Sequence, residues 1–430
     1  MITPSFGLTA TERVLPKLAL DFTTALLDSR VTFTRTTGAS NPATYVDSSG
    51  YVTVATNNQA RFDYDPVTLA CKGLLIEEAR TNIFTYSAEL DRLSKSRSTI
   101  TADQANAPDN QNTADAFNDD ATASNTHFAS SPSFSFTSGT SYTLSVYAKQ
   151  NGRNISLALS SGSFGANVRY TFNLTDGTYA QNVAGTNSSA NIVDAGGGYW
   201  RCSVTSQATA TASSVVLFYL INGSTLSYSG DITKGVYIWG AQLEAGAFAT
   251  SYIPTTTTAL TRNADVATMT GTNFSDWFNA SEGTFQAKYI LEGKNPGTPG
   301  YSQGVLCAWS GAYANSISIF EYINVSNESR TRGYIVAANT IVCNLQQTVL
   351  SAPNTPYDIV LGYKINSFVA CKNAGTILTD SSGNVPTGIN ELRIGQEYSG
   401  PTRSLNGWIQ QINYWPQRVV NAESQAFSKV

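Results

Sequence analysis

The feature that most constrains the fold is an alternation of side-chain character with a period of two residues, which recurs in short runs. In "SYTLSVYAKQ" every second residue faces the same side of an extended chain, and these residues are Tyr142, Leu144, Val146 and Ala148. In "GVYIWGAQLEAG", Val236 and Ile238 alternate with Tyr237 and Trp239. Clusters of turn residues such as "DSSG" and "DAGGG" separate the runs. Many short strands with such turns indicate β-sandwiches or jelly rolls.

Helix signals are nearly absent. The final segment "NAESQAFSKV" predicts a short helix with Asn421 as its cap and Glu423 in its first turn, and "AELDRLSKS" around Leu90 predicts a second short one. The run "GWIQQINYWPQ" predicts a strand with two faces: Trp408, Gln410, Ile412 and Tyr414 on one, and Ile409, Gln411, Asn413 and Trp415 on the other. We therefore expect an all-β chain of jelly-roll or β-sandwich domains in tandem, with a short closing C-terminal helix.

Composition narrows the classes of partner. Only 13% of the 430 residues are charged and 11% are aromatic, which suits strands because aromatic and β-branched side chains pack well on a sheet. The net charge is −4 and no cluster of Lys and Arg occurs, so we expect neither nucleic acid nor an anionic membrane as partner. No run of about 18 apolar residues occurs, so we expect no membrane insertion. "MITPSFGLTATERVLPKLAL" lacks a basic start followed by an apolar core, so we expect no secretory signal.

Side chains for metal or nucleophilic chemistry are scarce. The five cysteines are far apart with no C-x-x-C, which excludes zinc and redox motifs at the level of pattern and suits folding in a reducing cytoplasm. The single histidine, His127, is expected to be an ordinary strand residue. The two "DSSG" segments, at Asp47 and Asp380, offer oxygen donors for Ca²⁺, but an Asp-x-x-Gly hairpin turn explains both more simply. We therefore expect no cofactor.

The chain divides into zones. We predict an N-terminal β unit over residues 1–86, a middle domain over 87–255, a connector over 256–265 and a third domain over 266–430. The connector is expected to be extended because Pro254 and four consecutive Thr disfavour helix. The phrases "TFTRTTG" at Thr32 and "ALTRNAD" at Ala259 resemble each other but are too short to prove a duplication.

Charge is concentrated in one stretch, "RFDYDPVTLACKGLLIEEARTN", which runs from residue 61 to residue 82. Glu77 and Glu78 are adjacent, so in a strand they point to opposite faces and do not flank one scissile bond. The one that faces inward needs a cation, most simply Arg80 or Arg61. We interpret the charged residues of this stretch as a structural joint, and they are Arg61, Asp63, Asp65, Glu77, Glu78 and Arg80.

The same stretch resembles a phrase that recurs in virion proteins of tailed bacteriophages, and "FTRTTGASNPATYVDSSGYV" resembles the segment that usually precedes it. "GGYWRCSVT" and "GVYIWGAQLEAGAFATSYIPT" resemble a carbohydrate-binding-module-like jelly roll. "LNGWIQQINYWPQRVVNAESQAF" resembles the last strands and closing helix of concanavalin A/laminin-G-like domains. The resemblance covers most of the chain and implies a tail fibre, head fibre or decoration protein, without saying where on the particle it lies.

Glycan-binding residues are sought among aromatic side chains, because a ring offers a flat apolar surface to the C–H face of a sugar. In "YWR", alternation places Trp200 and Cys202 together on one face, which we expect to be the core. In the third domain we take loop-bordered residues as candidates for a lectin-like surface: Trp309, Tyr313, Tyr398 and Arg403.

Three functions fit these features. The first is a virion structural protein, assembled in the host cytoplasm, that adheres to a host-surface glycan or to other virion proteins and is not an enzyme. The second is a host-glycan depolymerase or lyase of the phage tail, which needs clustered carboxylates. The third is a bacterial adhesin, which needs an export signal. We expect a homo-oligomer, by analogy a trimer. We also expect attachment through the N-terminal zone, because residues 1–20 have too little apolar periodicity to order themselves alone.

Overall fold

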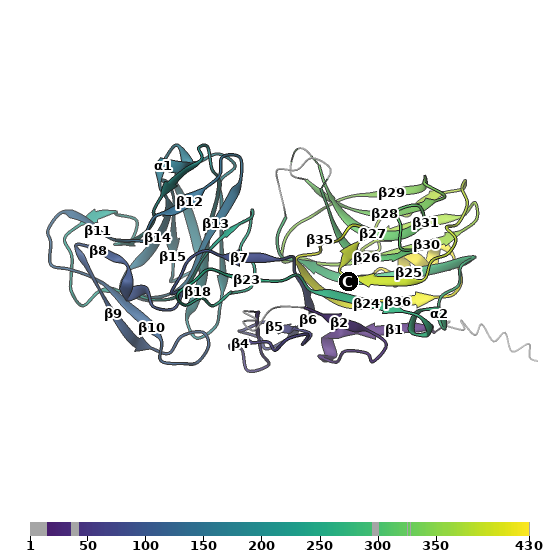
Figure 1. Cartoon of the computed structure of the whole chain (residues 1–430), viewed down its shortest axis with the longest axis horizontal. Coiled ribbons are helices and arrows are strands. Elements are labelled where there is room, and N and C mark those ends of the chain that lie inside the picture. The colour runs from purple at the N-terminus through teal and green to yellow at the C-terminus, as the bar shows by residue number, and fades with distance from the viewer. Residues whose placement is uncertain (1–14, 36–42, 295–300, 325, 327, 430) are drawn as a thin grey trace, which may run out of the picture.

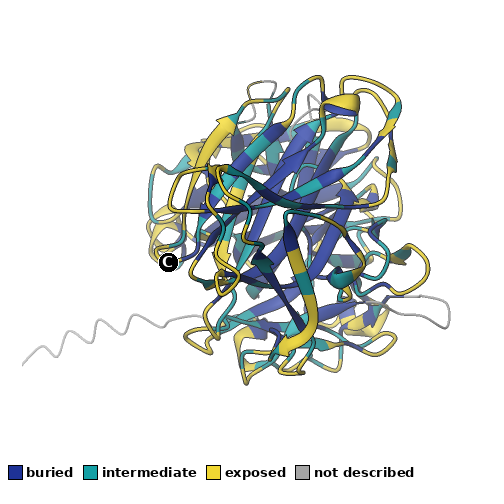
Figure 2. Ribbon diagram, turned by 90° about the vertical axis from the view of Figure 1, so that its left-hand side faces the viewer, coloured by how far each residue is buried: buried dark blue, intermediate teal, exposed yellow. Residues whose placement is uncertain are grey.

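The computed structural model describes residues 15–35, 43–294, 301–324, 326 and 328–429. The described chain is nearly all β and forms two lobes that lie side by side (Figure 1). Buried residues lie on the strands in the interior of the molecule, and exposed residues lie mainly on the loops around it (Figure 2). The all-β prediction with a short C-terminal helix is therefore confirmed.

The lobe on the right of Figure 1 is a sandwich of two antiparallel sheets that uses both ends of the chain. We call it the C-terminal sandwich, because most of its strands come from the C-terminal part of the chain. The first sheet has the order β32-β31-β30-β25-β36-β6-β5, with β1 also paired to β36. Its strands are β1 (Leu18–Asp21), β5 (Phe62–Tyr64), β6 (Cys71–Ile76), β25 (Glu282–Leu291), β30 (Pro356–Lys364), β31 (Phe368–Lys372), β32 (Leu378–Asp380) and β36 (Gly407–Trp415). The second sheet runs β2 (Thr32–Thr34), β24 (Val266–Thr270), β33 (Glu391–Ile394), β26 (Tyr301–Trp309), β27 (Ser316–Ile323), β28 (Ser329–Ala337), β29 (Thr340–Ser351).

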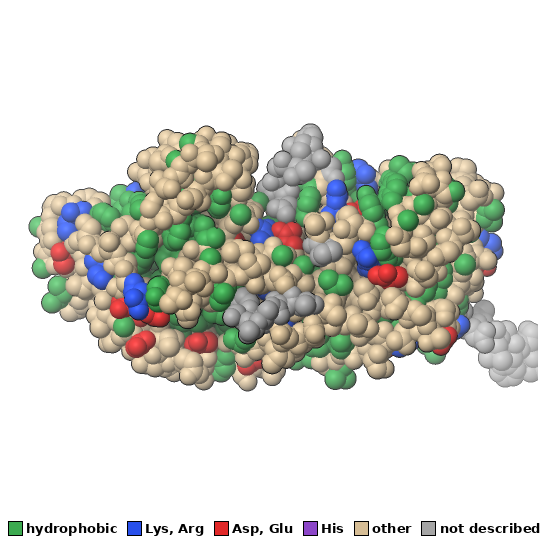
Figure 3. All heavy atoms as spheres, viewed as in Figure 1, with side chains coloured by type: hydrophobic (Ala, Val, Ile, Leu, Met, Phe, Trp, Pro, Cys, Tyr) green, Lys and Arg blue, Asp and Glu red, His purple; other side chains and the backbone are tan. Residues whose placement is uncertain are grey.

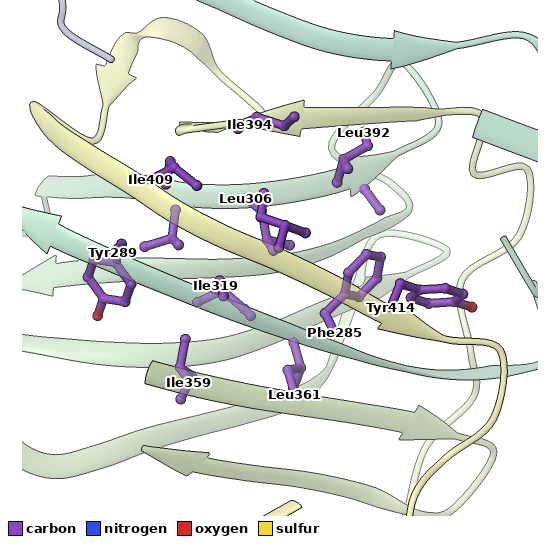
Figure 4. Close-up of a cluster of buried hydrophobic side chains, with 14 of the residues drawn as sticks. Phe285, Tyr289, Leu306, Ile319, Ile359, Leu361, Leu392, Ile394, Ile409 and Tyr414 are labelled. Atoms are coloured by element: carbon purple, nitrogen blue, oxygen red, sulfur yellow. The ribbon is translucent and has the colours of Figure 1, made fainter. Parts of the chain in front are cut away.

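The two sheets enclose one apolar core. Figure 4 shows Phe285, Ile359 and Ile409 of the first sheet pointing toward Leu306 and Ile319 of the second. The N-terminal strands contribute to the same core, since Leu18 and Leu20 of β1 are buried in it. Strands from the first 76 residues are thus paired with strands that lie between residues 266 and 415. The predicted domain boundaries themselves stay a prediction.

The lobe on the left of Figure 1 is a second antiparallel sandwich. One sheet runs β17 (Ser189–Asp194), β18 (Tyr199–Gln207), β13 (Ser141–Asn151), β22 (Gly235–Ala245), β10 (Ala114–Asp119), β9 (Ser98–Ala105). The other runs β16 (Thr178–Val183), β15 (Val168–Asn173), β14 (Asn154–Leu159), β20 (Val216–Ile221), β11 (Asn125–Ser130), β21 (Ser227–Tyr228), with β8 (Ser94–Ser96) also on β11.

The alternation predicted for β13 and β22 is confirmed, and it separates two apolar clusters. Val146 of β13 and Ile238 of β22 belong to the core between the two sheets of this lobe. Tyr147 and Trp239, the next residues along each strand, belong to a smaller aromatic cluster with Tyr252 on the opposite side of the sheet. Both faces of β13 and β22 therefore carry apolar clusters.

Smaller elements complete the chain. Four two-stranded ribbons are β3 (Thr44–Val46) with β4 (Val52–Val54), β7 (Arg80–Asn82) with β23 (Leu260–Arg262), β12 (Phe134–Phe136) with β19 (Ala212–Ser214), and β34 (Gln396–Glu397) with β35 (Gly400–Ser404). The helices are α1 (Ser161–Phe164), α2 (Thr272–Ser275) and α3 (Asn421–Phe427), with 3₁₀ turns at Phe22–Thr24 and Leu90–Arg92. The ribbon β7–β23 runs between the two lobes (Figure 1).

Two sequence-based details are wrong. The cap of α3 is Val420, whose backbone N–H donates to Glu423 (3.3 Å), so Asn421 is the first helical residue. In β36, Ile409 and Ile412 face the same core, because Ile409 pairs with Tyr289 and Gln411 pairs with Lys288. That register leaves one extra residue, a β-bulge, and a bulge interrupts the period of two.

The place of β1 in the sandwich leads to a first prediction. Leu20→Ala should lower the free energy of unfolding of the C-terminal sandwich by about 2–5 kcal/mol, because it leaves a cavity in a closed core. Leu20 is 2% exposed, whereas Leu26 in the same segment is 71% exposed and provides a matched control. Chemical denaturation of both variants measures the effect. Equal stability of Leu20→Ala and Leu26→Ala would show that the N-terminal strand does not belong to this core.

Candidate functional site

Five fully buried charged side chains lie where the two lobes meet. This joint cluster consists of Arg35, Arg61, Glu77, Arg262 and Asp265. Glu77 forms ion pairs with Arg61 Nη2 at 2.7 Å and with Arg262 Nη1 at 3.1 Å. Asp265 pairs with Arg35 at 3.0 Å and also with Arg61. The cluster therefore ties the segments that flank β2, β5, β6 and β23 into one network.

Glu77 also holds the end of the left-hand lobe. Its carboxylate accepts from the backbone N–H and the hydroxyl of Ser251, both at 2.7 Å. Burial by itself raises the pKa of Glu77, but the guanidinium groups of Arg262 and Arg61 outweigh that effect and hold its pKa at about 2. The carboxylate is thus ionised at neutral pH and binds both lobes.

The other residues predicted for the joint lie nearby but have different partners. Arg80 pairs with Glu78 at 2.5 Å and donates to the carbonyl of Ala245. Asp63 accepts from Trp408 Nε1 at 3.0 Å and pairs with Lys72 at 3.4 Å.

Asp65 is separate from the joint cluster. It accepts from the backbone N–H groups of Val67 and Thr68 at 3.0 and 2.7 Å and so closes its own turn.

Sequence reasoning missed three of the five residues of the joint cluster. Arg35 lies 26 residues before the charged stretch, and Arg262 and Asp265 lie 180 or more residues after it, so only tertiary structure brings them to Glu77. A signal was nevertheless present, because Arg35 and Arg262 occupy the same place in the two similar phrases "TFTRTTG" and "ALTRNAD". Both arginines bind carboxylates of this one cluster.

A cleft of about 600 Å³ lies beside the joint cluster, between the outer face of the β17–β18–β13 sheet, the N-terminal strands and the edge of the C-terminal sandwich. Its aromatic residues are Tyr45, Tyr64, Tyr147, Phe248, Tyr252 and Trp408. Its charged residues are Asp63, Lys72, Asp194, Arg201, Glu292 and Lys294. The face of the molecule seen in Figure 3 carries few charged side chains, so six of them around one cleft are a local concentration.

Trp408 is held rigidly in this cleft. Lys72 lies over its ring, 3.5 Å from the ring centroid, while Asp63 accepts from its indole N–H. The second oxygen of Asp63 accepts from the backbone N–H of Val46 at 2.7 Å. Both oxygens of Asp63 are therefore engaged in holding the cleft wall, which is what the charged stretch contributes here.

The lectin-like surface predicted in the third domain lies elsewhere, beside the second sheet of the C-terminal sandwich. Tyr313 and Tyr398 are brought together, with ring centroids 4.7 Å apart. Trp309 joins them through Arg393, which lies 3.9 Å from its ring centroid and donates to the Tyr398 carbonyl at 3.2 Å. Arg403 pairs instead with Glu397 at 3.6 Å. This surface is a second candidate site, and Arg393 is the residue that sequence reasoning missed.

The predicted hairpin turn is confirmed at Asp47, between β3 and β4, and is wrong at Asp380, which ends β32 and leads into an irregular segment. Asp47 accepts from the backbone N–H groups of Ser49 and Tyr51 at 2.8 and 3.1 Å, and Asp380 accepts from that of Ser382 at 3.0 Å. Among the residues that the structure describes, no group of three or more potential metal ligands from His, Cys, Asp and Glu occurs. None of the helices in the described ranges is long and apolar enough to cross a membrane.

No protein-family model matches the chain, and no curated protein matches it. Among solved structures, the Ruminococcus gnavus IT-sialidase CBM40 bound to α2,3-sialyllactose is similar over 35% of this chain and 84% of that chain, with 14% identity and a TM-score of 0.27. The leech intramolecular trans-sialidase is similar over 35% and 24%, with 12% identity and a TM-score of 0.25. Trypanosoma rangeli sialidase is similar over 77% and 62%, with 10% identity and a TM-score of 0.29. Likenesses this slight carry no argument about function.

The joint cluster leads to a second prediction. Glu77→Gln should lower the free energy of unfolding by about 3–5 kcal/mol, because it leaves three buried arginines with one carboxylate. Glu89→Gln is the matched control, because Glu89 pairs with Arg92 at the surface and such pairs contribute about 0–1 kcal/mol. Denaturant titrations compare the two variants, and equal losses would contradict a stabilising role of the cluster.

A third prediction compares the unsubstituted protein with Glu77→Gln: the stability that the Glu77 carboxylate contributes should disappear in acid. The folded-state pKa is depressed to about 2 from an ordinary 4.5, so the stabilisation is fully present above pH 4.5 and is lost as the pH falls toward 2. The difference in unfolding free energy between the unsubstituted protein and Glu77→Gln should therefore shrink over that range. A constant difference would mean that the carboxylate charge is not what stabilises the joint.

Proposed function

We propose that this chain is a structural protein of a tailed-bacteriophage virion, of the fibre, tail-tip or capsid-decoration type, that binds a host-surface glycan in the cleft between its lobes. The protein binds and does not cleave. It is carried on the particle as a homo-oligomer, a trimer by analogy with other appendages, and contacts other virion proteins through its N-terminal region.

The cleft is the observation that carries the glycan-binding part of the proposal. Sugar sites combine aromatic rings, which cover C–H faces, with a few convergent polar groups that orient hydroxyls. Here Tyr64 and Phe248 supply half-buried rings, and Ser203 and Asn191 supply polar groups from neighbouring strands of one sheet. A volume of about 600 Å³ suits a short oligosaccharide.

The virion part of the proposal is supported by the phrase at residues 61–82. Its charged side chains supply Arg61 and Glu77 to the joint cluster and Asp63 to the cleft wall. Related two-lobed appendages would need the same segment, because it joins their two lobes and forms the cleft wall. Most of the predicted attachment segment, residues 1–14, lies outside the described residues.

Binding in the cleft is tested by comparing two tyrosines. Tyr64→Ala should weaken binding of host-surface oligosaccharides about tenfold or more, because truncating an aromatic anchor in a binding pocket typically costs at least about 1.4 kcal/mol. Tyr313→Ala, on the second candidate site, is the matched control and should leave the affinity unchanged. Isothermal titration with oligosaccharides from the host surface measures both. If Tyr313→Ala weakened binding and Tyr64→Ala did not, glycan binding would belong to the second candidate site instead.

Attachment is tested by truncation. Removal of residues 1–14 should leave thermal unfolding unchanged but prevent incorporation into particles, whereas removal of residues 1–20 also deletes the core side chains Leu18 and Leu20 and should destabilise the fold. Mass spectrometry of purified particles reports incorporation. Particles that still contain the 15–430 chain would show that attachment uses another surface.

A depolymerase is the alternative function, and one observation favours it. Burial and the nearby Glu77 carboxylate raise the pKa of Glu292 to about 8, and a protonated carboxyl group in a cleft has the chemistry of a general acid. Its neighbour Asp63 is engaged at both oxygens, which leaves no free carboxylate from that residue to serve as a partner. Host glycan incubated with the protein should therefore keep its length. Shortening that Glu292→Gln abolishes would establish the alternative.

A further inference from the structure

One cation in the cleft lacks the carboxylate partner that other buried arginines have. Arg201, on β18, forms no ion pair with any described residue within 4.0 Å, in contrast to Arg61 and Arg262 of the joint cluster. Its Nη2 is 3.4 Å from the hydroxyl of Ser145, and its buried Nε, like those of Arg61 and Arg262, has no hydrogen-bond partner, so the difference lies in the missing carboxylate. A half-buried guanidinium with unused donors is costly unless a ligand supplies the acceptor.

The surroundings of Arg201 suit a sugar rather than a bare anion. Its guanidinium lies 5.3 Å from the ring centroid of Tyr147, on the strand paired to β18. Ser203 and Thr205 follow at alternate positions of β18, so they line the same side of the sheet and the same cleft. One wall of the cleft thus combines a guanidinium that can pair with a carboxylate, hydroxyl groups that can hydrogen-bond to a sugar, and an aromatic ring.

Glu292 lines the same cleft, and its raised pKa favours the protonated, neutral form at pH 7. Burial and the Glu77 carboxylate raise its pKa, as does Asp63, while Lys72 and Arg201 lower it less, leaving it at about 8. A protonated carboxyl group does not neutralise Arg201, and it offers one O–H donor. The cleft also holds the cations Lys72 and Lys294 and the carboxylates Asp194 and Asp63, the second of which is engaged at both oxygens. A ligand carboxylate can accept from Arg201 and from protonated Glu292.

We propose that the cleft selects acidic glycans, and that the carboxylate of a uronic or sialic acid residue pairs with Arg201 while Glu292 donates to it. This inference rests on the proposed glycan-binding function and adds the class of sugar. Arg is suited to the task because its planar guanidinium binds carboxylate oxygens in pairs.

The first test uses acidic oligosaccharides and their neutral counterparts. The probes are a glucuronate-containing and a galacturonate-containing tetrasaccharide and sialyllactose, each beside the same compound with its carboxyl group reduced to an alcohol. At least one acidic probe should bind the full chain about tenfold more tightly than its reduced form, as measured by isothermal titration. Arg201→Gln should abolish the preference. Arg169→Gln, which alters an arginine over Tyr219 outside the cleft, should preserve it.

The outcomes separate this inference from the proposed function. Equal binding of acidic and reduced forms, still weakened by Tyr64→Ala, would overturn the selection of acidic sugars and leave glycan binding in the cleft standing. A complete lack of binding to every probe and to host oligosaccharides would overturn both. Loss of the preference in Arg201→Gln counts only if its thermal unfolding matches that of Arg169→Gln; a preference that persists in a folded Arg201→Gln overturns the inference.

The second test follows the pH. Ionisation of Glu292 places a negative charge beside the bound carboxylate, so the affinity for an acidic probe should fall about tenfold as the pH rises through 8, and should stay level for Glu292→Gln. The substituted amide keeps a donor and cannot ionise. The same fall with pH in Glu292→Gln would remove Glu292 from the site.

Discussion

The contact between Glu77 and its two arginines is the interaction on which the two-lobed architecture depends. Arg61 and Arg262 come from segments about 200 residues apart, and both form ion pairs with one buried carboxylate that also holds Ser251. Buried ion pairs contribute little net stability compared with apolar packing, but they are strongly directional, and any arrangement that separates them leaves a charge unpaired. We therefore interpret the joint cluster as what fixes the arrangement of the two lobes. Breaking it is costly, although an apolar joint of the same size would be about as stable.

The cleft follows from that joint. Ser251, held by Glu77, is followed by Tyr252, which lines the cleft, while Asp63 in the same charged stretch holds the indole of Trp408. One wall of the cleft belongs to the left-hand lobe and the other to the C-terminal sandwich. The distance between the walls is therefore set by the joint cluster and not by either lobe alone. A ligand that spans the walls would in turn favour the joined arrangement.

How far the sequence predicts the structure depends on the range of the interactions involved. Alternation identified the strands and the two faces of β13, and the acidic residue in the first turn identified α3, because these signals are local. The bulge that turns Ile409 and Ile412 to one core follows from pairing with β25, which no local pattern contains. Arg201 could be singled out in "YWR" from the sequence, but only the structure shows that β18 lies beside the cleft and that Arg201 can meet a ligand there.

The pairing of β1, β5 and β6 with strands near the other end of the chain governs the order of folding during synthesis. When the ribosome has made the first 255 residues, the left-hand lobe has all its strands, but β1 and β6 still lack β36. These segments must wait, unpaired and with apolar side chains such as Leu74 exposed, until β36 (Gly407–Trp415) has left the exit tunnel. The C-terminal sandwich therefore closes only after β36 has been made, and a chain that terminates before β36 keeps an open sheet edge that invites aggregation.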